Sequence, residues 1–482
     1  MAIIRGNRTQ VNLFPSSIDE FVSSDDPVRV YDSFIEALNS EELGLDTQEN
    51  KVGAPRYDNL TMLKILVYSY SYGWRSSRKI ERALLHNVSF MWLSGGLKPD
   101  HKTISNFRKT NKGSLKKVLK QCAKFCIETD LIEGNILFID GSKFRANAGI
   151  SQSRTAKGHM EREAFLDKRI SELLAEIEKK DQEETSLKSM NDLKGKVKKI
   201  QGQKGKIKDI LNIIQEQDKR FNTTDIDSKV MKGRQGSHSS YNIQISTDDK
   251  HGLIVHADAT NSANDFNELT NQVRKADENL SQPSKIICAD AGYASANDIA
   301  NIIDEKQIIV PTPNLVRASE KQINPFDKQN FIYNKQKDIY LCPKGKELYR
   351  SSYNESKKCY RYRLKNNPCN TCEFFGKCTK DKRGREITRL LNQEVVDKME
   401  LDYKQESNKN IYRRRQTKVE LPFGHLKRNL GAGYFLLRGK TGANAEISIL
   451  STCFNISRII NLFGGVKETL KAISKYKLKI TN

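Results

Sequence analysis

The sequence lacks any long apolar segment. Among its 482 residues no apolar stretch reaches the roughly eighteen residues that a membrane-spanning helix needs. The first residues, from Met1 to Gly6, also lack the apolar core of a secretory signal peptide. We therefore expect a cytoplasmic protein that has no membrane partner.

Acidic residues are too few to balance the basic ones. Lys and Arg total 82 against 59 for Asp and Glu, which gives a net charge of +23 and a pI of about 9.4. An excess of this size favours a polyanionic partner, and DNA or RNA more than an anionic membrane surface. Charge alone identifies no reaction, because a basic protein without catalytic activity would have the same composition. The length favours about two to four domains.

Residues 1–130 are predicted to form a helical DNA-binding domain. An apolar face recurs between Leu60 and Tyr72, and a further helix begins near Ser77. Pro99 and Asp100 then suit the start of another helix. Its expected outward residues suit the major groove of DNA: they are Lys102, Thr103, Ser105, Asn106 and Arg108, with Ile104 and Phe107 facing inward. An ordinary solvated amphipathic helix is the alternative.

Short apolar runs alternate with helical segments in residues 131–310 and 401–465. We expect strands at 136–139, 241–246, 252–257, 285–289 and 308–310, and helices at 264–278, at 294–303 and beyond 405. The second and third strands form a predicted hairpin. This order predicts an α/β fold with a ribonuclease H-like catalytic core, in which helices flank a mixed sheet.

Two insertions interrupt this core. Residues 152–222 are rich in Lys, Glu and Gln, and their apolar residues recur at helical spacing, which favours an inserted helical arm over a solvated charged spacer. Residues 311–400 form a second insertion that contains most of the cysteines. Residues 466–482 are expected to be a C-terminal tail.

Two aspartates directly follow predicted strands. Asp140 comes after the run 136–139, and Asp290 comes after the run 285–289. Because the carboxyl ends of parallel strands meet at one edge of an open sheet, we expect the two side chains to lie close together, with Glu420 across from them on a late helix. Three carboxylates can hold Mg²⁺ for phosphodiester chemistry. Taken singly, each residue would be a turn former, a helix cap or a surface residue.

The sequences around these carboxylates resemble those of bacterial insertion-sequence transposases of the DDE class. Asp140 lies in the motif Phe-Ile-Asp-Gly-Ser-Lys, and Asp290 lies in the motif Asp-Ala-Gly-Tyr. Six residues separate Glu420 from Lys427, as in the family. The family's Tyr–Arg–Glu–Lys signature would then begin at Tyr412. The resemblance extends from about residue 50 to residue 465.

The signature departs from the family pattern at its arginine. The family places this arginine four positions before the glutamate, where Gln416 stands in this chain. Arg413, Arg414 and Arg415 therefore remain alternatives; Arg413 would share a helix face with Glu420 and Lys427. Pro422 predicts a kink or a new start in that helix, which weakens this geometric argument.

The resemblance implies a function and its partners. It implies Mg²⁺-dependent strand cleavage and strand transfer, with Mn²⁺ able to substitute, on double-stranded DNA of the terminal inverted repeats and of the target. Tyr412, Arg413 or Arg415, and Lys427 would hold the DNA end, and a homodimer would bring two ends together in the bacterial cytoplasm at the nucleoid. The alternatives are a catalytically inactive DNA-binding relative and another ribonuclease H-like nuclease such as a resolvase; the motifs disfavour the resolvase.

Five of the nine cysteines fall between Cys342 and Cys378. One Cys-x-x-Cys pair with two further cysteines can form a tetrahedral structural zinc site: the candidate ligands are Cys342, Cys369, Cys372 and Cys378. Related transposases carry a similar cysteine-bearing insertion. Cys359 is a competing ligand, and a reduced, partly buried cysteine group is the alternative to a metal site. The remaining four cysteines are expected to be core residues.

Overall fold

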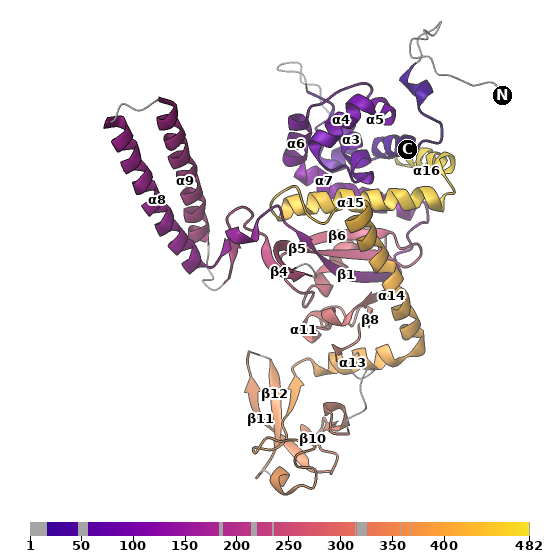
Figure 1. The fold of residues 1–482 in the computed structure, drawn as a ribbon. Coiled ribbons are helices and arrows are strands. Elements are labelled where there is room, and N and C mark those ends of the chain that lie inside the picture. Colours follow the sequence, from indigo (N-terminus) through magenta and orange to yellow (C-terminus); the bar gives the residue numbers. More distant parts are fainter. Residues whose placement is uncertain are drawn as a thin grey trace, which may run out of the picture. The chain divides into compact units, whose positions relative to one another are not determined.

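The computed structural model describes most of the chain. The described residues are 17–46, 56–182, 187–213, 219–233, 236–313, 315, 325–356, 358–366 and 368–481. Residues 1–16 and 47–55 of the predicted N-terminal domain therefore lie outside the described residues, as do parts of both predicted insertions. The fold is mixed α/β and begins with a helical region (Figure 1).

The chain divides into two compact units. Unit 1 comprises Met1–Asn264, Lys275–Pro283 and Thr417–Asn482, and unit 2 comprises Asp265–Arg274 and Ser284–Gln416. Two helices, α10 (Leu269–Asp277) and α14 (Glu406–Gly424), belong partly to each unit.

Unit 1 begins with a helical region. Its elements are η1 (Ile18–Phe21), α1 (Val28–Glu36), α2 (Ser40–Leu43), α3 (Asn59–Ser71), α4 (Ser77–His86), α5 (Val88–Leu93), α6 (His101–Thr110) and α7 (Lys112–Glu128). Helix α3 is buried from Met62 to Tyr70 and forms the centre of this region. The helices predicted to begin near Ser77 and Asp100 are confirmed. The Asp100 carboxylate caps α6 by accepting a hydrogen bond from the Thr103 N–H at 2.7 Å.

An antiparallel sheet follows in unit 1. Its strands are β1 (Ile136–Arg145), β4 (Lys229–Gly233), β5 (Gly236–Asp248) and β6 (Ile254–Thr260). Strand β5 pairs with β1 along one edge, and along its other edge it pairs first with β4 and then with β6. The predicted hairpin is therefore confirmed as β5 and β6, whereas β4 was not predicted from the sequence.

Helix α15 (Lys440–Leu462) covers the outer edge of β6 (Figure 1). Asn455 bonds both backbone groups of Ile254: its Oδ1 accepts from the N–H at 2.9 Å and its Nδ2 donates to the carbonyl at 2.8 Å. Asn444 accepts the Ala259 N–H in the same way at 2.6 Å. These amides satisfy strand groups that would otherwise lack partners at a buried sheet edge.

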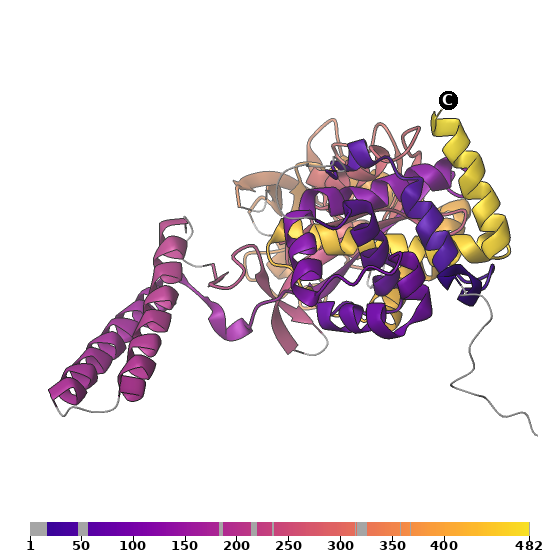
Figure 2. The same cartoon turned by 90° about the horizontal axis from the view of Figure 1, so that it is seen from above.

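The arm insertion contains two long helices, α8 (Ala156–Gln182) and α9 (Leu187–Ile213), which lie side by side (Figures 1 and 2). Their shared core consists of Leu173, Leu193 and Val197. At the base are η2 (Ile150–Gln152) and a two-stranded ribbon of β2 (Ser153–Arg154) and β3 (Phe221–Asn222). The helices predicted in this insertion are therefore present.

Unit 2 contains a parallel pair of strands, β7 (Ile286–Ala289) and β8 (Gln307–Ile309). The short elements η3 (Ala291–Tyr293) and α11 (Ala296–Ile299) connect them, and α13 (Gln393–Lys404) packs against α11 and β8. The helix predicted over 294–303 is thus shorter than expected. The expected helix beyond 405 is preceded by α13.

The cysteine-bearing part of unit 2 is an antiparallel five-stranded sheet. Its strands are β9 (Ile332–Asn334), β10 (Ile339–Leu341), β11 (Glu347–Asn354), β12 (Cys359–Leu364) and β13 (Ile387–Leu390), accompanied by η4 (Lys328–Asn330) and η5 (Pro368–Thr371). Each strand pairs with its neighbour in sequence. The core is formed by Phe331, Tyr340, Leu348, Tyr362 and Ile387.

The expected C-terminal tail is helical over residues 466–481. Helix α16 (Val466–Thr481) packs against α1, and Tyr476 contacts Phe125 edge-on with ring centroids 5.1 Å apart. Among the described helices, none is by itself long and apolar enough to cross a membrane. Only α15 and α16 taken together, bent by 110° at their junction, have the required length and composition.

Candidate functional site

Asp140 lies within β1 and not at its end as expected. The strand continues to Arg145 because residues 141–145 remain paired with β5, and Asp140 is opposite Ile245. Side chains alternate along a strand, so Asp140, Ser142 and Phe144 share one face. Asp140 is half-buried, and its Oδ1 accepts the Gly141 N–H at 2.9 Å.

The C-terminal part of α14 and the turn that follows it lie along this face of β1. Lys418 donates to the carbonyl of Asp249, whose own N–H bonds to Ile136 at the start of β1. Lys427 donates to the Ser142 hydroxyl, and its ammonium lies 4.7 Å from the Phe144 ring centre. The segment from 418 to 427 therefore runs in the same direction as the strand.

Glu420 lies between these two anchoring contacts and is exposed. Phe423, one helical turn later, packs near Phe144 with ring centroids 6.3 Å apart. Asp140, Glu420 and Lys427 are thus all carried by elements that pack together within unit 1. The helix does not restart at Pro422 but continues to Gly424 and widens into the π-helical turn η6 (His425–Asn429) that carries Lys427.

Buried contacts fix the loop that follows this segment. Phe435 is fully buried and stacks on Phe144 at 5.7 Å, and its N–H bonds to the Arg145 carbonyl at 2.8 Å. Arg75 donates to the carbonyls of Gly431 and Tyr434 and pairs with buried Glu446 at 2.8 Å. Main-chain and buried charged contacts therefore hold the chain that follows Lys427.

Asp225 and Asp227, which have no place in the predicted carboxylate trio, have a structural role. Asp225 accepts from the Tyr241 hydroxyl at 2.7 Å and from the Gly439 N–H at 3.1 Å, and Asp227 accepts from the Lys440 N–H at 2.8 Å. Both carboxylates therefore bind the N-terminus of α15, where unpaired N–H groups and the helix dipole favour negative charge.

Asp290 directly follows β7 in unit 2, as predicted. Its Oδ1 accepts the Gly292 N–H at 2.8 Å and so caps η3. A Cβ on Gly292 would lie 2.9 Å from this oxygen, which explains the glycine of the Asp-Ala-Gly-Tyr motif. The same Cβ would lie 3.7 Å from the Asp265 Oδ2, so a second carboxylate borders Gly292. No sequence signal singled out Asp265, because it follows no apolar run.

Tyr412 lies near Asp290 within unit 2, and Arg415 lies beside Tyr412. Burial raises the pKa of Tyr412, and the negative charge of Asp290 acts in the same direction. The Arg415 guanidinium lies 5.4 Å from the Tyr412 ring centre. Arg413 is exposed and instead bonds to Asn410 at 2.6 Å and pairs with Glu406 at 3.2 Å. Of these two arginines, Arg415 is therefore the one beside the tyrosine.

The structure corrects one residue of the predicted recognition helix. Lys102, Ser105 and Asn106 of α6 are exposed and Thr103 is half-buried, but Arg108 is only 6% exposed. Its guanidinium donates to the Tyr70 hydroxyl at 3.1 Å and to the Arg75 carbonyl at 2.7 Å. The expectation that Arg108 points outward was wrong, because a residue four after Ile104 lies on the same, buried, helix face.

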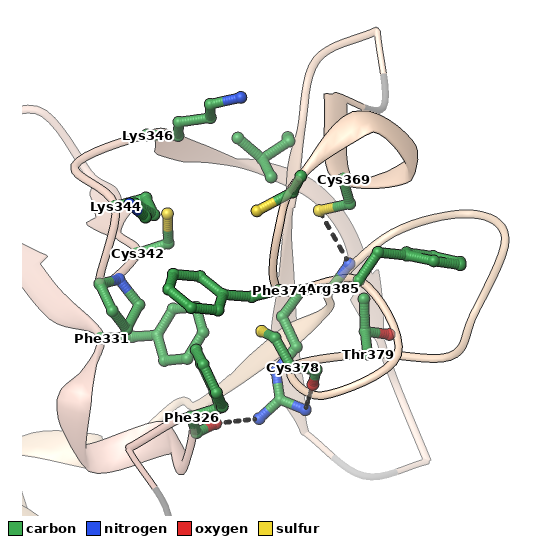
Figure 3. Close-up of a pocket in the computed structure, with 14 residues that line it drawn as sticks. Phe326, Phe331, Cys342, Lys344, Lys346, Cys369, Phe374, Cys378, Thr379 and Arg385 are labelled. Atoms are coloured by element: carbon green, nitrogen blue, oxygen red, sulfur yellow. Dashed lines mark hydrogen bonds between the residues drawn. The ribbon is translucent and has the colours of Figure 1, made fainter.

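The four candidate zinc ligands line one cavity of about 40 Å³ in unit 2. Figure 3 shows the sulfurs of Cys342, Cys369 and Cys378 around it, and Cys372 also lines it. Burial raises the pKa of the Cys378 thiol, while the Arg385 N–H donates to the Cys369 sulfur at 3.5 Å. Cys359 is buried in β12 and does not line the cavity.

Among the residues that the structure describes, no three His, Cys, Asp or Glu side chains are placed closely enough to hold a metal ion. The four thiols line one cavity, but they do not form a closed metal site. The donor chemistry still suits metals: thiolates suit zinc, and carboxylates suit magnesium.

The chain is a strongly basic α/β protein with a helical N-terminal region and with carboxylates close to cationic side chains, a combination that suits a polyanionic partner. Two family models match the chain: a transposase domain (DUF772) over residues 16–110 and a transposase DDE domain over residues 341–460. Two segments of the chain are thus similar to an N-terminal transposase domain and to a transposase DDE domain. A transposase DDE domain has a ribonuclease H-like core, uses a divalent metal ion and acts on DNA, and the similarity to it covers residues 341–460 of this chain.

The match to the DDE domain includes Glu420, Tyr412, Lys427 and the cavity cysteines, while Asp140 and Asp290 lie outside it. No curated protein and no solved structure matches the chain.

Proposed function

We propose that the protein is a DNA transposase that binds the terminal inverted repeats of its mobile element and catalyses metal-dependent strand cleavage and strand transfer. The observation that carries this proposal is the packing of Asp140 and Lys427 on one face of β1, with Glu420 on the adjoining segment of α14. Carboxylates beside a lysine can combine metal binding with binding of a phosphate.

Asp140, Asp290 and Glu420 would hold the divalent metal ions. Their oxygen ligands match the preference of Mg²⁺, for which Mn²⁺ could substitute. When bound, such ions activate the attacking oxygen and stabilise the leaving oxygen of a phosphodiester. Asp140 is half-buried and Glu420 is exposed, so both carboxylates keep access to solvent.

The remaining candidate residues would bind DNA. Lys427 and Arg415 carry positive charge next to Ser142 and Tyr412 respectively, and each can neutralise a phosphate. Lys102, Thr103, Ser105 and Asn106 of α6 would contact the terminal repeat, since short polar side chains and lysine suit the major groove. Arg108 has no part in this surface.

The carboxylate assignment is tested by cleavage of a labelled terminal-repeat fragment in Mg²⁺. We expect Asp140→Asn, Asp290→Asn and Glu420→Gln each to lower the cleavage rate by about 100-fold or more while leaving DNA binding in place. Glu468→Gln, which removes an exposed carboxylate from α16, is the matched control and should cut at the normal rate. Normal cleavage by Asp290→Asn would show the assignment to be wrong. A wild-type protein that binds the repeat but cuts it in neither Mg²⁺ nor Mn²⁺ would instead support an inactive relative.

We also propose a structural zinc ion at Cys342, Cys369, Cys372 and Cys378. Their convergence on one cavity supports it, because binding of such a metal ion adds to the folding energy of a small region. Elemental analysis of purified protein should find about one zinc per chain, and Cys372→Ser should lose it. Cys359→Ser, which alters a buried cysteine outside the cavity, should keep the zinc. Equal zinc content in the two variants would contradict the assignment.

We further propose that the protein acts as a homodimer at the bacterial nucleoid, because two DNA ends must be joined to one target. Sedimentation of the protein with terminal-repeat DNA should detect a complex of two chains and two ends. A complex that contains one chain under conditions where cleavage proceeds would contradict this.

A further inference from the structure

We propose that the outward face of α9 in the arm is a second DNA-binding surface, which contacts the phosphate backbone of duplex DNA without reading its sequence. The choice of DNA as partner rests on the proposed function. The face itself is inferred from charge, burial and helix geometry.

The two arm helices differ strongly in charge. Helix α9 has eight lysines and two aspartates, which gives it a net charge of +6, whereas α8 has six basic and seven acidic residues and a net charge of −1. The basic residues of α9 are all lysines, which suit phosphate as point charges but do not provide the bidentate contacts by which arginine reads guanine. This composition favours contact with the DNA backbone.

In the described part of the arm, two lysines of α9 lie beside acidic residues of α8. Lys204 pairs with Asp167 and lies 4.0 Å from Glu163, and Lys208 also lies 4.0 Å from Glu163. Within the described part of the arm, no salt bridge involves Lys198, Lys199 or Lys206, and all three are exposed. Their positive charges therefore face solvent without compensation from a carboxylate.

Glycines lie among these lysines on the same face. With about 100° between successive residues, the outward face carries a mixed row of six exposed residues: Gly195, Lys198, Lys199, Gly202, Gly205 and Lys206. The opposite face buries Leu193, Val197 and Ile207. A Cβ at any of the three glycines would meet no atom within 4 Å. Packing inside the protein therefore does not explain them, although glycine weakens an exposed helix.

Close approach of a DNA backbone to the helix explains why this face carries both lysines and glycines. Because glycine has no side chain, the helix surface is lower between two lysines. The phosphate backbone of a DNA strand can therefore lie near the helix axis, and the lysines reach it from both sides. The helix of 27 residues is about 40 Å long, which corresponds to roughly one turn of duplex DNA. A second copy of α8 is a poorer partner, because its net charge is close to zero.

The test compares two variants that each remove three positive charges. In the full-length protein, Lys198→Gln, Lys199→Gln and Lys206→Gln alter the outward face of α9, and Lys157→Gln, Lys168→Gln and Arg169→Gln alter α8. Binding to a duplex without terminal-repeat sequence is measured over a series of salt concentrations. We expect the α9 variant to lower the slope of log affinity against log salt by about 2.7, or about 0.9 for each lost phosphate contact. The α8 variant should keep the wild-type slope.

Equal slopes for wild type and the α9 variant, with helicity preserved by circular dichroism, would overturn the inference. A change from dimer to monomer with an unchanged slope would also overturn it and would identify the face as a subunit contact. Replacing the three glycines by alanine should raise helicity and weaken duplex binding; undiminished binding would contradict the close approach. Failure of the proposed function is distinguishable, because then the wild-type protein would neither cut nor prefer the terminal repeat.

Discussion

At the scale of single residues, the surroundings of each candidate side chain decide its role. Arg108 and Arg415 are both arginines on helices, yet the first bonds to Tyr70 inside the helical region and the second lies against Tyr412. Gly292 leaves room for the Asp290 carboxylate, which a Cβ would approach to 2.9 Å. Such contacts depend on distances that a sequence motif does not contain.

The two arginines of the signature provide a prediction at this scale. Arg415→Ala should lower terminal-repeat cleavage by about 100-fold, because Arg415 lies beside Tyr412 and can supply charge to a bound phosphate. Arg413→Ala should change the rate far less, since Arg413 is exposed and already pairs with Glu406. Single-turnover cleavage measures both variants. The reverse order of effects would assign the signature arginine to position 413.

At the scale of secondary-structure elements, buried side-chain amides and charges join helices to strands. Asn455 and Asn444 bond to the edge of β6, while Asp225 and Asp227 bind the first residues of the same helix, α15. Helix α15 is buried through most of its length and therefore connects the sheet to α3 and α7. These bonds hold the elements that carry Asp140 and Lys427.

Asn455 provides the prediction at this scale. Asn455→Leu should destabilise unit 1 by about 2–4 kcal/mol, because it leaves the N–H and carbonyl of Ile254 buried without partners. Asn461→Leu, an exposed position on the same helix, is the control and should change the free energy of unfolding by less than about 0.5 kcal/mol. Urea unfolding followed by circular dichroism measures both. Equal stability of the two variants would show that the amide bonds contribute little.

At the scale of the whole molecule, charge and pH have separate effects. The net charge of +23 favours binding to DNA, as does the similarity of two segments to transposase domains. Stability in acid instead depends on groups whose pKa differs between the folded and unfolded states, and His256 is one of them. Burial lowers the pKa of His256 to about 4, and the Asn279 amide donates to its Nδ1 at 3.4 Å, so the folded protein keeps this imidazole neutral.

The pKa of His256 predicts the direction of acid destabilisation. The unfolded chain binds a proton at this histidine below pH about 6.5, whereas the folded protein does so only near pH 4. The contribution of the neutral imidazole to the free energy of unfolding is therefore complete above pH 6.5 and is lost as the pH falls toward 4. Between pH 7.5 and pH 5 the wild type should lose about 2 kcal/mol more stability than His256→Gln. His86→Gln, at an exposed position, should behave like the wild type. Urea titrations at the two pH values measure this difference.

Local patterns in the sequence predicted much of the secondary structure. The apolar run 136–139, the alternation in 241–246 and the cap at Asp100 each depend on neighbouring residues alone, and β1, β5 and α6 form where they predict. The helical spacing in the arm also persists, with Leu173, Leu193 and Val197 in contact. The net charge likewise indicated a polyanionic partner, and the spacing of four cysteines indicated one group of thiols.

Tertiary contacts decided the rest. Strand β1 extends past Asp140 because β5 continues to pair with it, and residues 466–481 form a helix because α1 provides a packing surface. Arg108 is buried because its helix face meets Tyr70, which lies 38 positions earlier in the sequence. Composition and short-range periodicity thus determined the types of element and the chemistry available. Long-range strand pairing and burial determined how far each element extends and which charged side chains face solvent, because these contacts join residues that are far apart in the sequence.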